Sequence, residues 1–343
     1  MLNEFKLEGP WRITFDTNPD QCNLNCIMCE EHSKYNNSKD TTNRIMKFEL
    51  IKKVIKNCIS HGLKEVIPST MGEPLLYKNF RELLKLIKMY ALKLNLTTNG
   101  TFPILGAEKW GRLILPIASD VKISINGVTD KINESIMEGV ESKKQIANLE
   151  NFLEIRNQVR AQGINYPTVT IQATFMERNI MDLPDLLKFA IDMDVDRFKG
   201  HHLWVTHNQL AGEDLRRNKA SIKRWNKTVE ELEYIAENNR LKNRKKIRLD
   251  NIYKLPFNGK AKSILEDYIC LFLGREAWIA WDGTFNVCCA PNDLRASFGY
   301  FGNINNYDFM DLWKSRAYLN LINNWGSYNV CKSCNMRRKI TKI

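Results

Sequence analysis

The alternation of short β-rich runs with longer amphipathic stretches, between residues 11 and about 205, constrains the fold most. Between these runs, residues 48–61, 81–90, 143–162 and 183–193 carry apolar residues at spacings of three and four, which is typical of helices. Such an alternation predicts βα units that build a parallel sheet. We therefore expect an α/β fold, a partial (β/α)6 TIM-like barrel with its chemistry at the carboxyl ends of the strands. The six expected strands are 11–16, 64–68, 93–97, 120–125, 168–174 and 196–205.

The chain changes character after the sixth expected strand. Residues 209–255 combine a polar helical pattern with a basic connector. Two alternating runs then meet at Asp282-Gly283, a strong hairpin signal, and a helix is expected over 308–324. We expect a barrel over 1–208, a helical linker over 209–255 and a small α+β domain over 256–343.

Composition and charge narrow the classes of protein. A hydrophobic content of 43% and an aromatic content of 10% fit a globular chain rather than a disordered one. No signal-peptide pattern or run of about 18 apolar residues occurs, so we expect a cytoplasmic protein without a membrane partner. The net charge of +12 admits an acidic partner, but the basic stretch 240–248 has almost no interleaved aromatic residues, which favours a solvated segment over a nucleic-acid site.

The nine cysteines favour metal or redox chemistry over a disulfide framework, because the chain has no secretion signal. Three lie close together near the N-terminus and five follow residue 269. Cys58 stands apart and shares a helical face with Ile51, Val54 and Ile55, which predicts a core thiol. This distribution predicts two metal centres, the first with Cys22, Cys26 and Cys29 and the second among the five later cysteines.

The N-terminal cysteines directly follow the first expected strand, at the catalytic end of the barrel. A [4Fe–4S] cluster takes four cysteines, so three thiolates leave one iron open. His32, three residues after Cys29, would instead complete a structural zinc site of three cysteines and one histidine. Spacing alone leaves both possibilities open.

The segment 16–29 resembles the CxxxCxΦC loop of the radical S-adenosylmethionine (SAM) superfamily. This resemblance implies that the open iron binds SAM and that Met28 occupies the apolar position that contacts adenine in relatives. Gly72-Glu73-Pro74, after the second strand, is similar to the Gly-Gly-Glu-Pro motif that binds the amino group of SAM. Met71 replaces the first glycine of that motif.

The later strands end in further polar residues. Thr97, Thr98, Asn99 and Ser124 match positions where relatives place polar groups against the ribose and carboxylate of SAM. Gln172 and Arg178 are candidate carboxylate or substrate contacts, and His202 is a candidate for adenine packing. Without the resemblance, these residues are as compatible with ordinary turns and solvated side chains.

The C-terminal cysteines resemble the short, or twitch, version of the SPASM auxiliary-cluster domain. The matching pattern is Cys270, twelve residues, Gly283, four residues and Cys288, followed by Cys331-Lys-Ser-Cys334. Four thiolates suffice for one closed [4Fe–4S] cluster, and a four-cysteine zinc site is the alternative. Cys289 is a candidate catalytic thiol that returns a hydrogen atom to a substrate radical, and a buried structural thiol is the other interpretation.

The resemblance implies an enzyme that cleaves SAM reductively to a 5′-deoxyadenosyl radical and abstracts a hydrogen atom from a small molecule, sugar or peptide. Dehydrogenation, epimerisation and bond formation are the expected outcomes, and flavodoxin or ferredoxin is the expected electron donor. The cysteine triad begins at residue 22, so we expect no separate peptide-recognition domain before it. A non-catalytic iron–sulfur electron carrier and a zinc-stabilised nucleic-acid-binding protein are the alternatives.

Overall fold

The computed structural model describes residues 8–37, 43–68, 71–257, 268–334, 336 and 338–339. Its contacts divide the chain into two compact units. The first unit holds residues 1–21, 42–94 and 262–343, and the second holds residues 22–41 and 95–261. The beginning of the chain and residues 258–267, near the expected start of the auxiliary domain, lie outside the described residues. No helix in the described ranges is long and apolar enough to cross a membrane.

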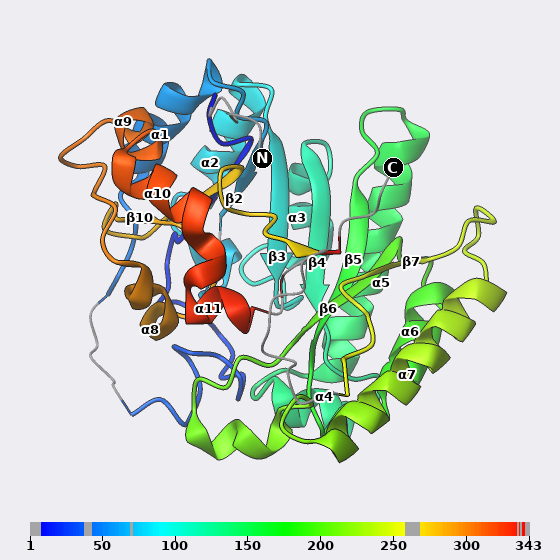
Figure 1. Ribbon diagram of the computed structural model, residues 1–343. Coiled ribbons are helices and arrows are strands. Elements are labelled where there is room, and N and C mark those ends of the chain that lie inside the picture. Colours follow the sequence, from blue (N-terminus) through cyan, green and yellow to red (C-terminus); the bar gives the residue numbers. More distant parts are fainter. Residues whose placement is uncertain are drawn as a thin grey trace. The chain divides into compact units, whose positions relative to one another are not determined.

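The first unit contains a mixed sheet (Figure 1). Strand β1 (Arg12–Phe15) pairs in parallel with β2 (Glu65–Ile67) and with β9 (Glu276–Ile279). The first residues of β3 (Lys93–Thr98) extend this sheet beside β2, and β10 (Phe285–Asn286) pairs antiparallel with β9, as the hairpin signal predicts. Helices α1 (Phe48–Ile59) and α2 (Phe80–Met89) follow β1 and β2. Cys58 is buried on α1 beside Val54 and Ile55, which confirms the predicted core thiol.

The C-terminal part of this unit surrounds an aromatic core. Phe285 lies 5.3 Å from Phe309 and 5.1 Å from Tyr318, measured between ring centroids. The prediction of one helix over 308–324 is wrong, because the Ser315 side chain accepts a hydrogen bond from Tyr318 N and starts a new helix. The elements here are β8 (Tyr268–Ile269), α8 (Asn292–Arg295), α9 (Phe309–Trp313), α10 (Arg316–Asn324), α11 (Asn329–Lys332) and β11 (Arg338–Lys339).

The second unit holds the remainder of β3 and four further parallel strands in the order β4, β5, β6, β7. Their bounds are Ala118–Ser124, Thr168–Phe175, Arg197–His202 and Arg248–Asp250. Strand β7 lies where a helical linker is expected, and it pairs with β6. The helices are α3 (Gly106–Ile114), α4 (Asp130–Ile136), α5 (Ser142–Ala161), α6 (Leu183–Asp192) and α7 (Lys219–Asn238), of which α6 and α7 lie side by side (Figure 1).

The strands of the second unit have one apolar and one polar face. Val121, Ile123 and Ile171 are buried apolar residues, whereas Ser124, Gln172 and Lys199 alternate with such residues and occupy one register row. Because side chains alternate across a strand, this row lies on the face opposite the apolar one. The parallel strands and their order confirm the predicted α/β barrel-type fold.

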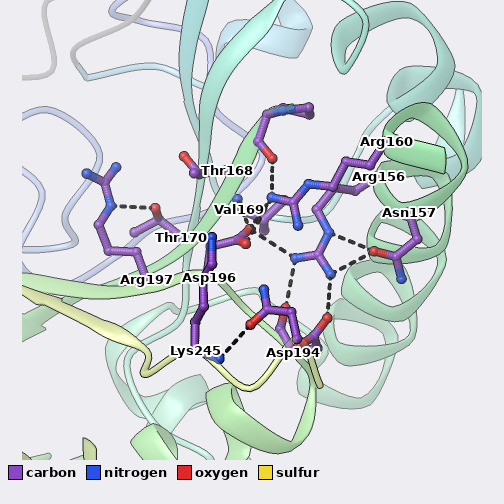
Figure 2. A network of polar contacts seen from close by, with 12 residues as sticks. Arg156, Asn157, Arg160, Thr168, Val169, Thr170, Asp194, Asp196, Arg197 and Lys245 are labelled. Carbon is purple, nitrogen blue, oxygen red and sulfur yellow. Dashed lines mark hydrogen bonds and ion pairs between the residues drawn. The ribbon is translucent and has the colours of Figure 1, made fainter. Parts of the chain in front are cut away.

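A polar network closes the opposite, amino-terminal end of strands β5 and β6 (Figure 2). The Arg156 side chain is fully buried on α5 and donates to Asp196 at 3.0 Å and to Asp194 at 3.2 Å. Arg160, one turn later, contacts Asp196 at 2.9 Å. One buried arginine therefore connects α5 to the segment that leads into β6.

Replacing Arg156 by methionine is expected to lower the free energy of unfolding by about 3 kcal/mol, because the change leaves two carboxylates without their buried partner. The matched control is Arg112→Met, which removes an exposed pair with Glu108 on α3 and should cost less than about 0.5 kcal/mol. Urea denaturation of both variants measures the difference. Equal losses would contradict the role assigned to Arg156.

Candidate SAM and iron–sulfur cluster sites

The cysteine loop that follows β1 is fixed by its backbone and by two apolar side chains. Asn25 N donates to Glu138 O at 2.8 Å, and Ile27 N donates to Ile136 O at 2.9 Å. Leu24 and Ile27 are buried in an apolar cluster with residues of α4 and of the segment that follows β6. Cys22, Cys26 and Met28 pack against that cluster. Along this loop, the buried apolar residues Leu24 and Ile27 thus alternate with the cysteines.

Two thiols of this loop, those of Cys26 and Cys29, have raised pKa values. Burial raises the pKa of Cys26, and the neighbouring Cys29 and Cys22 raise it further. Burial also raises the pKa of Cys29 to about 11, although the N–H groups of His32 and Glu31 oppose that shift. Cys26 and Cys29, whose pKa values are raised, suit a cationic iron cluster, because the cluster supplies the positive charge that thiolate ligands need.

The zinc alternative also depends on this loop. His32 places its backbone N–H 3.4 Å from Cys29 Sγ, in a hydrogen bond of the kind that tunes cluster sulfurs. Within the described ranges, no three Cys, His, Asp or Glu side chains converge closely enough to hold a metal ion as they stand. This holds for the set with His32 and for the three thiols alike, so geometry favours neither.

Asn99 connects the end of β3 to the cysteine loop. Its Nδ2 donates to Asn23 Oδ1 at 2.9 Å and lies 3.9 Å from Cys22 Sγ. Its Oδ1 accepts from Thr101 N at 3.0 Å, in an Asx turn that orients the amide. At this strand end the Asn99 side chain contacts the cysteine loop, Thr98 is buried and accepts a hydrogen bond from Gly100 N at 3.3 Å, and Thr97 is half-buried.

The Gly72-Glu73-Pro74 loop lies against the residues just before Cys22. A Cβ atom on Gly72 would lie 2.0 Å from Asn18 O, so only glycine permits this approach. Glu73 N donates to Gln21 O at 2.8 Å, and Asn18 Nδ2 donates to Glu73 O at 2.8 Å. Glu73 Oε1 caps the short helix that begins at Pro74. The close approach of this loop to Asn18 thus depends on Gly72, the second glycine of the motif. Met71, which replaces the first glycine, leaves this approach intact.

The pair of histidines that ends β6 points to two faces of the sheet. His202, predicted to pack on adenine, is buried on the apolar face, 4.7 Å from Trp225 of α7 and 5.7 Å from Phe175 between ring centroids. His201 lies on the polar face, in the register row of Thr174, two residues beyond the row of Ser124 and Gln172. Strand alternation thus separates two histidines that are neighbours in the sequence.

His201 is expected to make stability depend on pH. Burial, with the charges of Lys199 and Arg216, lowers its pKa to about 4, below the ordinary value of 6.5. The unfolded chain then binds more protons than the native one below pH 6.5, so His201 costs stability as pH falls towards 4. Between pH 7.5 and 5.5, wild type should lose about 1 kcal/mol more of unfolding free energy than His201→Gln. Parallel urea titrations at both pH values measure this, and identical losses would contradict the neutral buried imidazole.

The Arg178 side chain is held by hydrogen bonds to Glu213 and Ser135. Its Nε donates to Glu213 Oε1 at 2.8 Å, and its Nη1 donates to Ser135 O at 3.2 Å. The Arg178 N–H also donates to the Glu213 carboxylate at 3.0 Å. The guanidinium thus joins the ends of β5 and α4 to the 3-10 helix at Asn208–Glu213, and a catalytic role for it stays a prediction.

The residues just before Cys270 pair with residues 338–339, which follow Cys334, in the small sheet of β8 and β11. Cys270 Sγ accepts from Phe272 N and Leu273 N, each at 3.5 Å, and Cys334 Sγ accepts from Met336 N at 3.4 Å. Burial raises the pKa of Cys288 to about 12, and the nearby Cys334 and Cys270 raise it further. Cys331 is buried on α11, and Cys334 N donates to its carbonyl oxygen at 3.2 Å. Backbone N–H groups thus already solvate the Cys270 and Cys334 sulfurs, as they do for the sulfurs of protein-bound clusters.

Gly283 lies in the turn of the hairpin between β9 and β10, and Cys289 follows the expected ligand Cys288. Gly283 has a φ of +91°, and a Cβ there would lie 2.9 Å from the Asn303 and Asn305 side chains, so the hairpin requires glycine at the position that the motif specifies. Desolvation raises the pKa of the half-buried Cys289, and the neighbouring Cys288, Cys334 and Cys270 raise it further. It therefore lies among the expected ligands, and its role as a hydrogen donor stays a prediction.

Comparison with known families and curated relatives agrees with this geometry. Residues 19–190 match the radical SAM superfamily, and residues 270–335 match SPASM, an iron–sulfur cluster-binding domain. A tungsten-containing aldehyde ferredoxin oxidoreductase cofactor-modifying protein of Pyrococcus furiosus is 21% identical over 336 residues, which cover 92% of this chain and 85% of the relative. The PqqA peptide cyclase of Bradyrhizobium diazoefficiens is 25% identical over 197 residues, but the match covers 56% of this chain and 47% of that relative.

Solved structures show the same fold. SuiB of Streptococcus suis, bound to its precursor peptide SuiA, superposes with a TM-score of 0.67 at 17% identity, over 96% of this chain and 71% of that one. The same protein has also been solved with SAM bound. With half of the chain matched to one superfamily and the cysteine domain matched to a second family, the protein is a radical SAM enzyme that uses SAM and [4Fe–4S] clusters and carries a SPASM-type auxiliary domain.

Proposed function

We propose that this enzyme cleaves SAM reductively and uses the 5′-deoxyadenosyl radical to abstract a hydrogen atom from a C–H bond of a peptide or a small molecule. The observation that carries the proposal is the cysteine loop, whose three cysteines would leave one iron of a [4Fe–4S] cluster without a protein ligand. Cys22, Cys26 and Cys29 would hold that cluster, and Cys270, Cys288, Cys331 and Cys334 would hold the auxiliary one.

The residues for SAM follow from the strand ends. We assign the amino group of SAM to the Gly72-Glu73-Pro74 loop, its adenine to Met28, and its ribose and carboxylate to the polar residues that end β3, β4 and β5. Support comes from the glycine-dependent approach of that loop to residues 18–21 and from the shared register row of Ser124 and Gln172. The residues of the third group are Thr97, Thr98, Asn99, Ser124 and Gln172.

Two substrate classes remain in the proposal. The likeness to SuiB and to a PqqA peptide cyclase supports a peptide, and the likeness to a cofactor-modifying protein supports a small molecule. A reduced flavodoxin or ferredoxin would deliver the electron. Cys289 would return a hydrogen atom in an epimerisation, whereas in an oxidation the auxiliary cluster would accept an electron from the substrate radical.

Deuterium transfer distinguishes the substrate classes. The reconstituted enzyme is incubated anaerobically with SAM, dithionite and extract of host cells grown in deuterated medium, separated into a fraction below about 1 kDa and a peptide fraction. Mass spectrometry of 5′-deoxyadenosine should show deuterium with one fraction and none with the other. The Cys26→Ala variant is the control, and 5′-deoxyadenosine without deuterium from either fraction would contradict hydrogen abstraction from a substrate of these classes.

A further inference from the structure

Two buried amides of the second unit join the ends of strands β3 and β4. Gln145 of α5 and Asn133 of α4 are each about 1% exposed. Gln145 Nε2 donates to Asn99 O at 2.6 Å and to Ser124 O at 2.9 Å. Its Oε1 accepts from Asn133 Nδ2 at 2.8 Å, and Asn133 Oδ1 accepts from Asn126 N at 2.9 Å. Every polar atom of the Gln145 amide is therefore used.

These bonds matter because they lie where the strand pairing stops. β3 ends at Thr98 and β4 at Ser124, so the carbonyl groups at the strand ends need partners outside the sheet. A single side chain supplies both. Gly100, with φ of +77°, brings the chain so close that a Cβ there would lie 3.2 Å from Gln145 Cγ. The side chain thus sets the distance between the two strand ends.

The same strand end holds the cysteine loop. The Asn99 side chain donates to Asn23 Oδ1, and Asn23 Nδ2 donates to Thr101 Oγ1 at 3.0 Å. Gln145 binds the Asn99 carbonyl, so it fixes the residue whose amide contacts Asn23 and approaches Cys22. The chain of contacts runs from α5, through the end of β3, to the first cysteine of the motif.

We propose that Gln145 is a positioning residue for SAM, which spaces the ends of β3 and β4 and, through Asn99, orients the loop that carries Cys22. This inference rests on the proposed function. Gln145 touches neither cluster nor cofactor in it, and acts by fixing the backbone to which Asn99 and Ser124 belong. Supporting groups of this kind typically change metal affinity or activity by about 10- to 100-fold when they are removed.

The test compares Gln145→Leu, Gln145→Glu and Gln158→Leu. The leucine removes both donors, and the glutamate keeps the size of the side chain but as a carboxylate has no N–H to donate. Gln158 lies on the same helix at a half-buried position, so its replacement is the matched control. We expect both Gln145 variants to load iron as wild type does, and to need about tenfold more SAM for half-maximal 5′-deoxyadenosine formation. Gln158→Leu should match wild type.

Two readouts separate positioning from general destabilisation. Electron paramagnetic resonance of the reduced cluster should show a SAM-induced change that reaches completion at higher SAM concentration in the Gln145 variants. Hydrogen exchange of reconstituted protein without SAM should be faster at residues 22–28 and 95–101 in Gln145→Leu, and unchanged in Gln158→Leu. Unchanged exchange and unchanged SAM dependence would overturn the proposal, as would loss of iron from both Gln145 variants. If wild type itself forms no 5′-deoxyadenosine, the proposed function fails, whereas the exchange comparison still decides the role of Gln145.

Discussion

Replacement of Cys26 by alanine is expected to abolish 5′-deoxyadenosine formation and to reduce the iron content from about eight to about four atoms per chain. Cys26 lies on the loop whose remaining two thiols cannot hold a cluster of this type, whereas the C-terminal cysteines belong to a separate set. Anaerobic reconstitution, iron analysis and chromatography of the SAM cleavage products measure both changes.

The matched control is Cys58→Ala. The Cys58 side chain is fully buried on the apolar face of α1. Its replacement should cost about 1 kcal/mol of unfolding free energy and leave iron content and SAM cleavage unchanged. If Cys26→Ala retained all of its iron, or if Cys58→Ala lost as much, the assignment of the loop as a cluster site would fail.

Replacement of Cys334 by alanine is expected to remove about four irons as well, but to leave SAM cleavage in place. Burial raises the pKa of Cys288, and the nearby Cys334 and Cys270 raise it further, so these thiols belong to one neighbourhood. Because metal binding and folding are coupled in such small domains, this variant should also unfold at lower temperature than wild type. Iron analysis, SAM cleavage and thermal unfolding are the measurements.

Cys289→Ala separates ligands from neighbours in the same domain. Cys289 is half-buried and follows Cys288 directly, yet the motif does not count it among the four ligands. Its replacement should keep about eight irons per chain and normal SAM cleavage. Loss of about four irons from Cys289→Ala, with full retention in Cys334→Ala, would show that the ligand set is assigned incorrectly.

The strands and their order were predictable from sequence because their apolar patterns are short, periodic and separated by clear helical stretches. The observed β5, Thr168–Phe175, and β6, Arg197–His202, both overlap the expected ranges 168–174 and 196–205. The single helix expected over 308–324 was wrong, because Ser315 fits a helix interior as well as a cap until the position of Tyr318 N is known.

The supporting contacts of the site were not predictable. Gln145 and Asn133 are ordinary polar residues in amphipathic stretches, and only the fold shows that both are buried against strand ends. The two histidines of β6 illustrate a different limit. A shift of one residue moves a side chain to the other face of a strand, so the choice of His202 over His201 depended on register.

The most direct test of the central claim measures iron, sulfide and zinc in the anaerobically purified wild-type chain, together with 5′-deoxyadenosine formed from SAM under dithionite. We predict a brown protein with about eight irons and eight sulfides, no stoichiometric zinc, and SAM cleavage. A colourless protein with bound zinc, or an iron–sulfur protein that leaves SAM intact, would contradict it.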